Sequence, residues 1–161
     1  MFAGIISDLG QIRAIATTGD RRFEITTRYA TGDIDIGASI CCSGACMTVI
    51  DKGPDWFACT ASAETLARTT MGNWRIGRPV NLEWCLRMGD EIGGHLVSGH
   101  IDGVATVSTV TPDGASLKLV IQAPKALKSM IAAKGSVAID GVSLTVNSID
   151  AAAFAINIIP H

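Results

Sequence analysis

The sequence has few aromatic residues, little excess charge and no long hydrophobic run. Aromatic side chains make up 5% of the 161 residues, and the formal net charge is −2 at pH 7. Proteins that bind nucleic acid carry basic surfaces, and single-strand binders add aromatic stacking platforms. We therefore expect no nucleic-acid partner. The N-terminus has neither a basic region nor an apolar run of membrane-spanning length, which predicts no membrane association and a cytoplasmic location.

Cysteine is not distributed as in a secreted disulfide scaffold. The five cysteines are an odd set confined to the first part of the chain, whereas a disulfide framework needs pairs. We interpret them as reduced thiols. They fall on predicted strands without a Cys-x-x-Cys knuckle, and the histidines lack the spacing of a helical metal motif, so no metal site is expected.

Short runs rich in β-branched residues dominate the chain, broken by Gly, Asp and Pro every roughly 8–12 residues, which predicts an all-β protein. Candidate strands cover residues 4–16, 22–27, 39–51, 56–61, 79–85, 104–110, 116–122, 136–147 and 154–159. Two segments break the alternation, 64–68 and 125–131, and the second follows Pro124, a residue suited to the first turn of a helix. Both are predicted to be short helices.

An internal repeat organises the sequence. Residues 39–49 align with residues 136–146, which sets Cys46 opposite Ser143. Looking for such repeats comes before motif searching, because a missed repeat misassigns the whole fold. The match indicates two copies of one unit.

A second aligned segment strengthens this interpretation. Residues 3–6 align with residues 98–101, which sets Ile5 opposite His100. The order of the matches is kept, so we expect two domains, at 1–94 and 95–161. The second copy stops at a residue that matches Glu64, and its fold is therefore expected to be incomplete.

Six ordered motifs resemble the riboflavin synthase family of the α-chain type: MFAGII, SGACMTV, SAETLARTTMG, GGHLVSGHIDG, GSVAIDGVSLTV and INIIPH. The resemblance implies a tandem pair of six-stranded Greek-key β-barrels with short helices, the second barrel being incomplete in this chain. It implies a transferase that needs no cofactor. One molecule of 6,7-dimethyl-8-ribityllumazine gives a four-carbon unit to a second, yielding riboflavin and 5-amino-6-(ribitylamino)uracil.

The resemblance also implies partners. The family forms a homotrimer in which the first barrel of one subunit faces the second barrel of a neighbour, and an association with lumazine synthase is implied as well. Two similar pockets also suit a reaction between two copies of one ligand. The alternative is a non-catalytic, antenna-type protein that binds lumazine or flavin on the same fold and needs the pocket but no acid–base residue.

His100 is the candidate general base. The reaction removes a proton from the methyl group at C7 of a lumazine, and an unperturbed imidazole titrates near about pH 6.5, which suits this task. The aligned Ile5 cannot transfer a proton, so the repeats are expected to share shape but not chemistry. A histidine satisfied by backbone groups in a glycine-flanked turn is the structural alternative.

Polar side chains on the repeated strands complete the candidate catalytic set. Ser143 and Thr145 alternate along a predicted strand and so share one face, as do Cys46 and Thr48. Ser143 could hold the ring or assist addition to it, while Cys46 fits either a reactive thiol or a small buried side chain. Hydroxyls carried only for β-propensity are the alternative reading of Ser143 and Thr145.

The remaining candidate residues are predicted to bind substrate. Glycine-led segments would let backbone groups approach a flat heterocycle, and the walls of the pockets follow from the resemblance. Lys134 is a further candidate, although a solvated turn lysine explains it equally well. The predicted binding residues are Gly4, Ile5, Ile6, Cys46, Met47, Thr48, Thr60, Ala61, Ser62, Ala63, Glu64, Thr65, Gly99, His100, Ile101, Lys134, Ser143, Leu144, Thr145, Asn157, Ile158, Ile159, Pro160 and His161.

Overall fold

The computed structural model describes residues 1–151 and 153–160 and confirms the predicted all-β class. Within these residues no helix has the length and hydrophobicity of a membrane span. In chain order the elements are β1 (Asp8–Thr18), β2 (Asp20–Thr26), η1 (Thr31–Asp33), β3 (Ser39–Cys42), β4 (Ala45–Lys52), β5 (Trp56–Ala61), α1 (Ala63–Arg68), η2 (Thr70–Asn73), β6 (Pro79–Trp84), β7 (Thr106–Asp113), β8 (Ser116–Gln122), η3 (Lys125–Met130), β9 (Ser136–Ile139), β10 (Val142–Thr145), β11 (Ser148–Asp150) and β12 (Ala153–Ile158).

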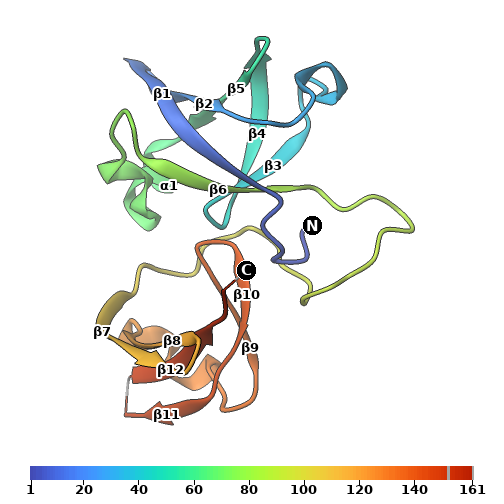
Figure 1. The fold of residues 1–161 in the computed structure, drawn as a ribbon. Helices are drawn as coiled ribbons and strands as arrows, with labels where there is room; N and C mark the ends of the chain where they lie inside the picture. Colours follow the sequence, from blue (N-terminus) through green and yellow to red (C-terminus); the bar gives the residue numbers. More distant parts are fainter. Residues whose placement is uncertain (152, 161) are drawn as a thin grey trace.

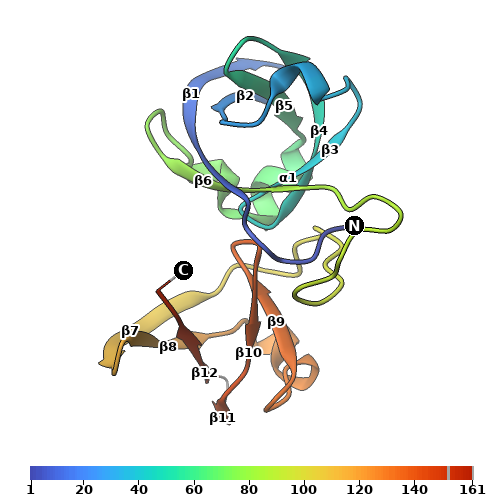
Figure 2. The same cartoon turned by 45° about the vertical axis from the view of Figure 1, so that its right-hand side comes forward.

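Strands β1 to β6 close into a barrel with the order β1-β2-β5-β4-β3-β6. Figure 2 shows this ring nearly end-on, above the second half of the chain. Strand β6 closes it, because Leu82 pairs with Asp8 on β1 and with Cys42 on β3. Closure pairs both edges of the sheet, so this half of the molecule presents no free strand edge.

Alternation of side chains fills the interior of this first barrel. On β4, Met47 and Val49 are buried in the core and Thr48 between them is exposed, as a period of two requires. Strand β4 therefore turns one face inward and the other outward. Trp74, which follows η2, enters the interior and meets the ring of Phe23 edge-on with the centroids 5.5 Å apart. The barrel therefore has a packed core.

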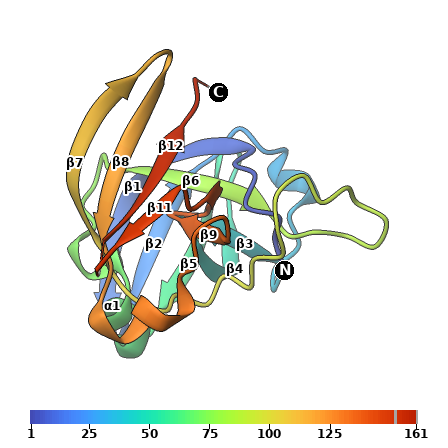
Figure 3. The same cartoon turned by 90° about the horizontal axis from the view of Figure 1, so that it is seen from below.

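The second half repeats the order of elements but does not close. Strands β9 and β10 form a two-stranded sheet, and β11-β12-β8-β7 form a four-stranded sheet (Figures 1 and 3). By the sequence alignment β9 corresponds to β3, β12 corresponds to β5, and β10 with β11 corresponds to β4. The counterpart of β6 would follow residue 161, so nothing in the described part of the chain bridges β7 and β9, and all eight residues of β7 are exposed.

Two of the predicted strands are wrong, because each is a hairpin. Residues 39–51 form β3 and β4, joined by a two-residue turn whose φ angles are 45° at Ser43 and 93° at Gly44. Residues 136–147 likewise turn at Asp140 and Gly141, with φ angles of 47° and 86°. Positive φ at both central residues is the requirement of a type I′ hairpin, which the continuous run of strand-forming residues concealed.

Other predicted elements have the expected type. Strands β5 and β8 have the predicted bounds, and a helix forms at α1, where the Thr65 amide donates to the Ser62 side chain over 3.2 Å. The segment after Pro124 is the 3₁₀ helix η3. Residues 4–7 were expected to begin the first strand, but β1 begins at Asp8.

A buried carboxylate anchors the start of β1. Asp8 accepts hydrogen bonds from the Thr27 hydroxyl over 2.6 Å and from the Arg28 amide over 2.8 Å, and pairs with the Arg28 Nε over 2.7 Å. Burial acts to raise the pKa of Asp8, but these hydrogen bonds outweigh it and hold the pKa below its usual value. The clamp fixes the beginning of β1 to the residues that follow β2.

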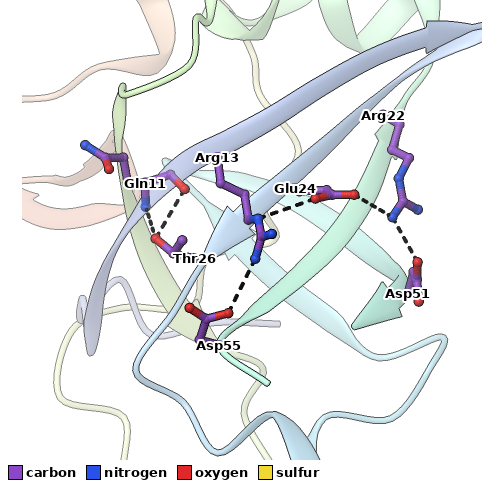
Figure 4. A network of polar contacts seen from close by, with 7 residues as sticks. All are labelled: Gln11, Arg13, Arg22, Glu24, Thr26, Asp51 and Asp55. Atoms are coloured by element: carbon purple, nitrogen blue, oxygen red, sulfur yellow. Dashed lines mark hydrogen bonds and ion pairs between the residues drawn. The ribbon is translucent and has the colours of Figure 1, made fainter. Parts of the chain in front are cut away.

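An ion-pair network covers the outer face of the first barrel (Figure 4). Glu24 on β2 lies between two arginines, 3.5 Å from Arg13 and 3.1 Å from Arg22, which in turn reach Asp55 and Asp51. Because these groups are exposed or only partly buried, each pair contributes little to stability. The network marks this face as ordinary solvated surface, away from the repeat-to-repeat contact.

Candidate functional site

Two antiparallel segments run between the halves of the molecule, in the region of Figure 1 where the N-terminus lies beside the long connection after β6. We call residues 2–6 the first strap and residues 95–101 the second strap. Phe2 and Val97 pair with each other, N–H to carbonyl in both directions, over 2.8 and 2.9 Å. These two residues are also counterparts in the sequence repeat, so the straps are related by an approximate two-fold axis.

Each strap lies against the strand of the other repeat. The Ser143 amide on β10 donates to the carbonyl of Gly4 over 2.8 Å. The Cys46 amide on β4 donates to the carbonyl of Gly99 over the same 2.8 Å. Gly4 and Cys46 belong to the first repeat of the sequence, and Gly99 and Ser143 belong to the second. In the structure each glycine contacts the strand of the other repeat.

The contacts are too close for any side chain at the two glycines. A Cβ on Gly4 would lie 2.7 Å from the Cβ of Ser143, and one on Gly99 would lie 2.6 Å from the Cβ of Cys46. Both glycines also have positive φ, 76° and 79°, where side chains are strained. The glycines were predicted to let the backbone approach a flat ligand; in the structure they let each strap approach the strand of the other repeat.

Strands β4 and β5 separate near Cys46, and the second strap lies beside β4 there. In the described residues the β4–β5 ladder runs from Lys52 and Phe57 to Val49 and Cys59 and goes no further toward Cys46. Beyond that point the second strap takes the place of β5 beside β4. The notch so formed presents backbone polar groups at the surface, which suits recognition of a flat, hydrogen-bonding ring.

The first candidate site lies at this notch. Cys46 is half-buried and Thr48 exposed on the outer face of β4. The second strap brings the backbone of Gly99 against Cys46, and the next residue, His100, has an exposed side chain. Phe2 covers the region from the other side, since it packs in one cluster with Cys41 and Val97. A thiol, a hydroxyl and an imidazole therefore come from both repeats to one site.

The second candidate site has the same backbone but different side chains. Ser143 is half-buried and Thr145 exposed on the outer face of β10, and the first strap brings Ile5 in place of a histidine. His95 contributes instead, because its Nδ1 lies 2.7 Å from the Ser143 Oγ. The two sites thus differ in chemistry, as the unequal residues of the repeat predicted.

The backbone of Lys134 is unusual. Its φ is 66°, and its amide donates to the carbonyl of Val146 over 2.7 Å. The counterpart in the first repeat is Gly37, with φ of 91° and the equivalent hydrogen bond to Val49 over 2.8 Å. A lysine held where the repeat uses glycine costs about 1 kcal/mol of strain. Both interpretations of Lys134, as a binding residue and as a turn lysine, stay predictions.

The segments predicted to form the walls of the sites lie at the ends of β5 and β12. The segment from Thr60 to Thr65 spans the end of β5 and the first turn of α1, and Ser62 to Glu64 are exposed. Asn157 is the penultimate residue of β12, and its side-chain amide donates to the Asp113 carboxylate over 2.7 Å. Met47 and Leu144 point to the cores of their halves rather than to the outer faces, and His161 lies outside the described residues.

The cysteines divide into buried and accessible thiols. Burial raises the pKa of Cys41 to about 12, and the neighbouring Cys59 thiol together with burial raises the pKa of Cys42 well above its usual value. These thiols stay protonated and act as core side chains. Cys46 is half-buried and lies at the first site, so both of its predicted roles remain open.

Three residues at the straps were missed by the sequence reasoning. Phe2 lies in the strap pairing, and His95 contacts Ser143. Glu83 on β6 is buried, and its carboxylate accepts the amides of Ala3 over 2.6 Å and Gly4 over 3.0 Å. A signal for Glu83 existed, since it is a charged residue inside a predicted apolar strand. The other two need the fold.

One cavity adjoins the candidate sites, because His95, Gly99 and His100 of the second strap are among its lining residues. It has a volume of about 470 Å³ and is lined by apolar side chains such as Ile121, Val137 and Phe154, with the second strap along one wall. In the first barrel the same interior is filled by Met71 and Trp74, whose counterparts would follow residue 161. We therefore interpret the cavity as unfilled barrel interior.

The sequence matches a known family of protein domains. The lumazine binding domain family matches residues 3–85 and again residues 98–161. Riboflavin synthase of Brucella abortus is 43% identical over 100% of this chain and 83% of its own length. Riboflavin synthase of Photobacterium phosphoreum is 38% identical over 100% of this chain and 75% of its own length.

Solved structures agree with the sequence relatives. LumP in complex with riboflavin superposes with a TM-score of 0.89 at 30% identity, covering 98% of this chain and 86% of LumP. LumP in complex with 6,7-dimethyl-8-(1'-D-ribityl) lumazine gives a TM-score of 0.87 at 28% identity, covering 99% and 86%. With two matched segments and full-length relatives, this chain belongs to the riboflavin synthase family of tandem lumazine binding domains.

Proposed function

We propose that this chain is a riboflavin synthase, a transferase that makes riboflavin and 5-amino-6-(ribitylamino)uracil from two molecules of 6,7-dimethyl-8-ribityllumazine. The observation that carries the proposal is the pair of sites with one backbone and two side-chain sets. Two sites of like shape accept two copies of one ligand. Unlike side chains give the two ligands different parts in the reaction.

Roles follow from the chemistry that each site offers. His100 at the first site is the base that removes a proton from the C7 methyl group of one lumazine, with Cys46 and Thr48 beside it. Ser143 and Thr145 at the second site hold the other lumazine for attack by the carbon nucleophile. Exposed backbone groups of both straps read the pyrimidine edge of each ring.

The complete catalytic centre would join two subunits. In this part of the proposal the first site of one subunit faces the second site of a neighbour, within a homotrimer. Because each site takes residues from both repeats, every subunit contributes both of its halves to both of its sites. The domain division at 94 and 95, an association with lumazine synthase, and a cytoplasmic location that suits five free thiols belong to the same proposal.

The second candidate function is that of a non-catalytic lumazine or flavin carrier. The superposition on ligand complexes of LumP supports it. A carrier needs the notch but not a proton-transferring side chain, so His100 beside Cys46 favours the enzyme.

Turnover separates the two functions. The protein is incubated with 6,7-dimethyl-8-ribityllumazine, and riboflavin is followed by its absorbance and by chromatography. We expect riboflavin to accumulate to half the amount of lumazine consumed, because two substrates give one product. Tight lumazine binding without riboflavin would establish the carrier and exclude the enzyme.

Mixing experiments test the shared centre. Cys46→Ala and Ser143→Ala proteins are assayed alone and after mixing under conditions that exchange subunits. If a centre joins two subunits, the mixture contains some centres with neither substitution and regains activity. Inactive single variants whose mixture stays inactive, despite exchange shown by mass spectrometry, would contradict the arrangement.

A further inference from the structure

A histidine–serine pair lies at the second site. The Nδ1 of His95 is 2.7 Å from the Oγ of Ser143, and both side chains are half-buried. This is a hydrogen-bond distance for an imidazole nitrogen and a hydroxyl. The two residues come from different segments, the second strap and β10, so only the folded chain brings them together.

The surrounding backbone fixes both members of the pair. The His95 amide donates to the carbonyl of Ala3 over 3.1 Å, and the Ser143 amide donates to the carbonyl of Gly4. The buried carboxylate of Glu83 holds the amides of these same two strap residues. Because one carboxylate orders the strap that both residues bind, the pair has little freedom to separate.

Glycine keeps the space around the hydroxyl closed. A Cβ on Gly94 would lie 2.8 Å from the Ser143 Cβ and 2.9 Å from its Oγ. A Cβ on Gly4 would also collide with Ser143. The serine therefore sits beneath two glycines and one imidazole, and the imidazole is the polar group directed at its oxygen.

The pair is absent from the equivalent place in the other repeat. Cys46 is the counterpart of Ser143, so the first repeat carries a thiol where the second site has the hydroxyl that His95 contacts. An interaction needed only to join strap and strand would be expected at both sites, since the strap hydrogen bonds are the same at both. The pair instead belongs to the chemistry of the second site.

We propose that His95 is a positioning residue for Ser143: its Nδ1 accepts the hydroxyl proton and holds Oγ with its lone pairs toward the ligand. The inference rests on the proposed riboflavin synthase function and deepens it by assigning a partner to the second-site hydroxyl. An ordered hydroxyl presents one hydrogen-bonding geometry to the ring, whereas a freely rotating one must be ordered during each turnover. The side chains then act as one unit.

Four variants of the full chain test the inference: His95→Ala, His95→Asn, Ser143→Ala and the double variant His95→Ala with Ser143→Ala. Asparagine places a hydrogen-bonding atom near the position of Nδ1 but does not titrate in the neutral range. Steady-state kinetics give kcat and KM across pH 5 to 9, and riboflavin fluorescence gives the affinity for product. Ile76→Ala, an exposed aliphatic side chain of the first half outside both straps, is the control.

We expect His95→Ala to lower kcat about ten- to a hundredfold with a much smaller change in riboflavin affinity. His95→Asn should recover most of kcat and lose the part of the pH profile that comes from imidazole titration. The double variant should be no slower than the slower single variant, because one interaction can be removed only once. Ile76→Ala should match the unmodified protein.

Three results would overturn the inference: multiplied losses in the double variant, an unaltered pH profile in His95→Asn, or an unchanged kcat in His95→Ala. If His95→Ala does not fold, His95→Asn and Ser143→Ala still give the pH profile and the comparison of rates. Failure of the proposed function looks different. In that case the unmodified chain makes no riboflavin, and the catalytic role of His95 falls with it.

Discussion

The two halves of the molecule carry the same set of local structures and end in different states. Both have the type I′ hairpin, the glycine-led strap and the separated strands beside it. The first half closes into a barrel through β6 and fills its interior with Trp74 and Met71. The second half keeps two sheets with β7 fully exposed and an open interior. Hairpins, straps and a small buried cluster around Ile121, Phe154 and Ile156 therefore form without closure of the sheet.

The two halves also differ in the side chains at the two sites, although the backbone hydrogen bonds there are equivalent. Equivalent backbone hydrogen bonds hold Cys46 and Ser143, but the side chains beside them are His100 in one site and Ile5 with His95 in the other. Duplication supplied two identical backbone frames. Substitution within those frames gave the two sites separate chemistry.

Replacing the first-site imidazole should produce the largest effect. His100→Ala is expected to lower kcat by about 10²-fold or more, because general-base catalysis contributes on that scale, while riboflavin affinity changes little. Ile5→Ala, at the equivalent place of the second site, should lower kcat far less. Kinetics and fluorescence titration of both variants measure the difference. Equal losses of kcat and affinity in His100→Ala would mean that His100 only binds.

A methyl group at either strap glycine should destabilise the protein strongly. Gly99→Ala and Gly4→Ala each combine a positive φ with a Cβ contact of 2.6 or 2.7 Å, and we expect each to lower the free energy of unfolding by about 3 kcal/mol. Gly19→Ala is the control, since its φ is 91° and no atom lies within 4 Å of the added Cβ.

Urea denaturation of these three glycine variants measures the difference. Gly19→Ala reports the backbone cost alone, at about 1 kcal/mol. A similar loss in all three variants would show that the exchanged straps are not closely packed in solution.

Acid should weaken the first barrel through Asp8. Its pKa in the folded protein lies below the usual value for an aspartate, so the carboxylate stabilises the fold at pH values above the unfolded-state pKa. This contribution is lost as the pH falls through the folded-state pKa. Asp8→Asn should therefore lower stability by about 2 kcal/mol at pH 7 and remove part of the pH dependence below pH 4.

An exposed carboxylate provides the comparison for Asp8. Asp51 pairs with Arg22 at the surface, and Asp51→Asn should change the pH dependence less because solvent screens that pair. Denaturation curves at pH 7 and pH 3 measure both variants. A pH dependence that survives Asp8→Asn unchanged would place the acid-sensitive group elsewhere.

The smallest expected effect is a gain in stability. Lys134→Gly gives the second repeat the residue found at Gly37 in the first, and relief of the strained φ should raise the free energy of unfolding by up to about 1 kcal/mol. If Lys134 binds ligand, riboflavin affinity should fall in the same variant. Thermal denaturation and fluorescence titration measure the two effects. Unchanged affinity would identify Lys134 as a turn residue.

Local features of the fold were predictable and long-range pairings were not. Alternation along β5 and β8 marked their bounds, and the aligned motifs indicated the duplication. The hairpin turns at Ser43-Gly44 and Asp140-Gly141 were missed although Asp-Gly is a strong local signal for a type I′ turn, because each segment was taken as one continuous strand.

The site was predicted in composition but not in arrangement. Cys46, Ser143 and His100 were singled out by type and by repeat position, whereas Glu83 and His95 escaped attention because their partners are distant in the sequence. A duplicated sequence also cannot tell whether a strap packs on its own copy or on the other. The local contacts of strap and strand are alike in both arrangements.

The sequence by itself determined the all-β class, the two repeats and the unequal residues at equivalent positions, because alternation, turn chemistry and side-chain identity are local properties. Only the tertiary structure decided that the straps exchange, which joins His100 to Cys46 and His95 to Ser143. The exchange of the straps depends on the connection after β6 and on the packing of Phe2 against Val97. Such contacts gain their energy from burial between distant segments, which no local pattern specifies.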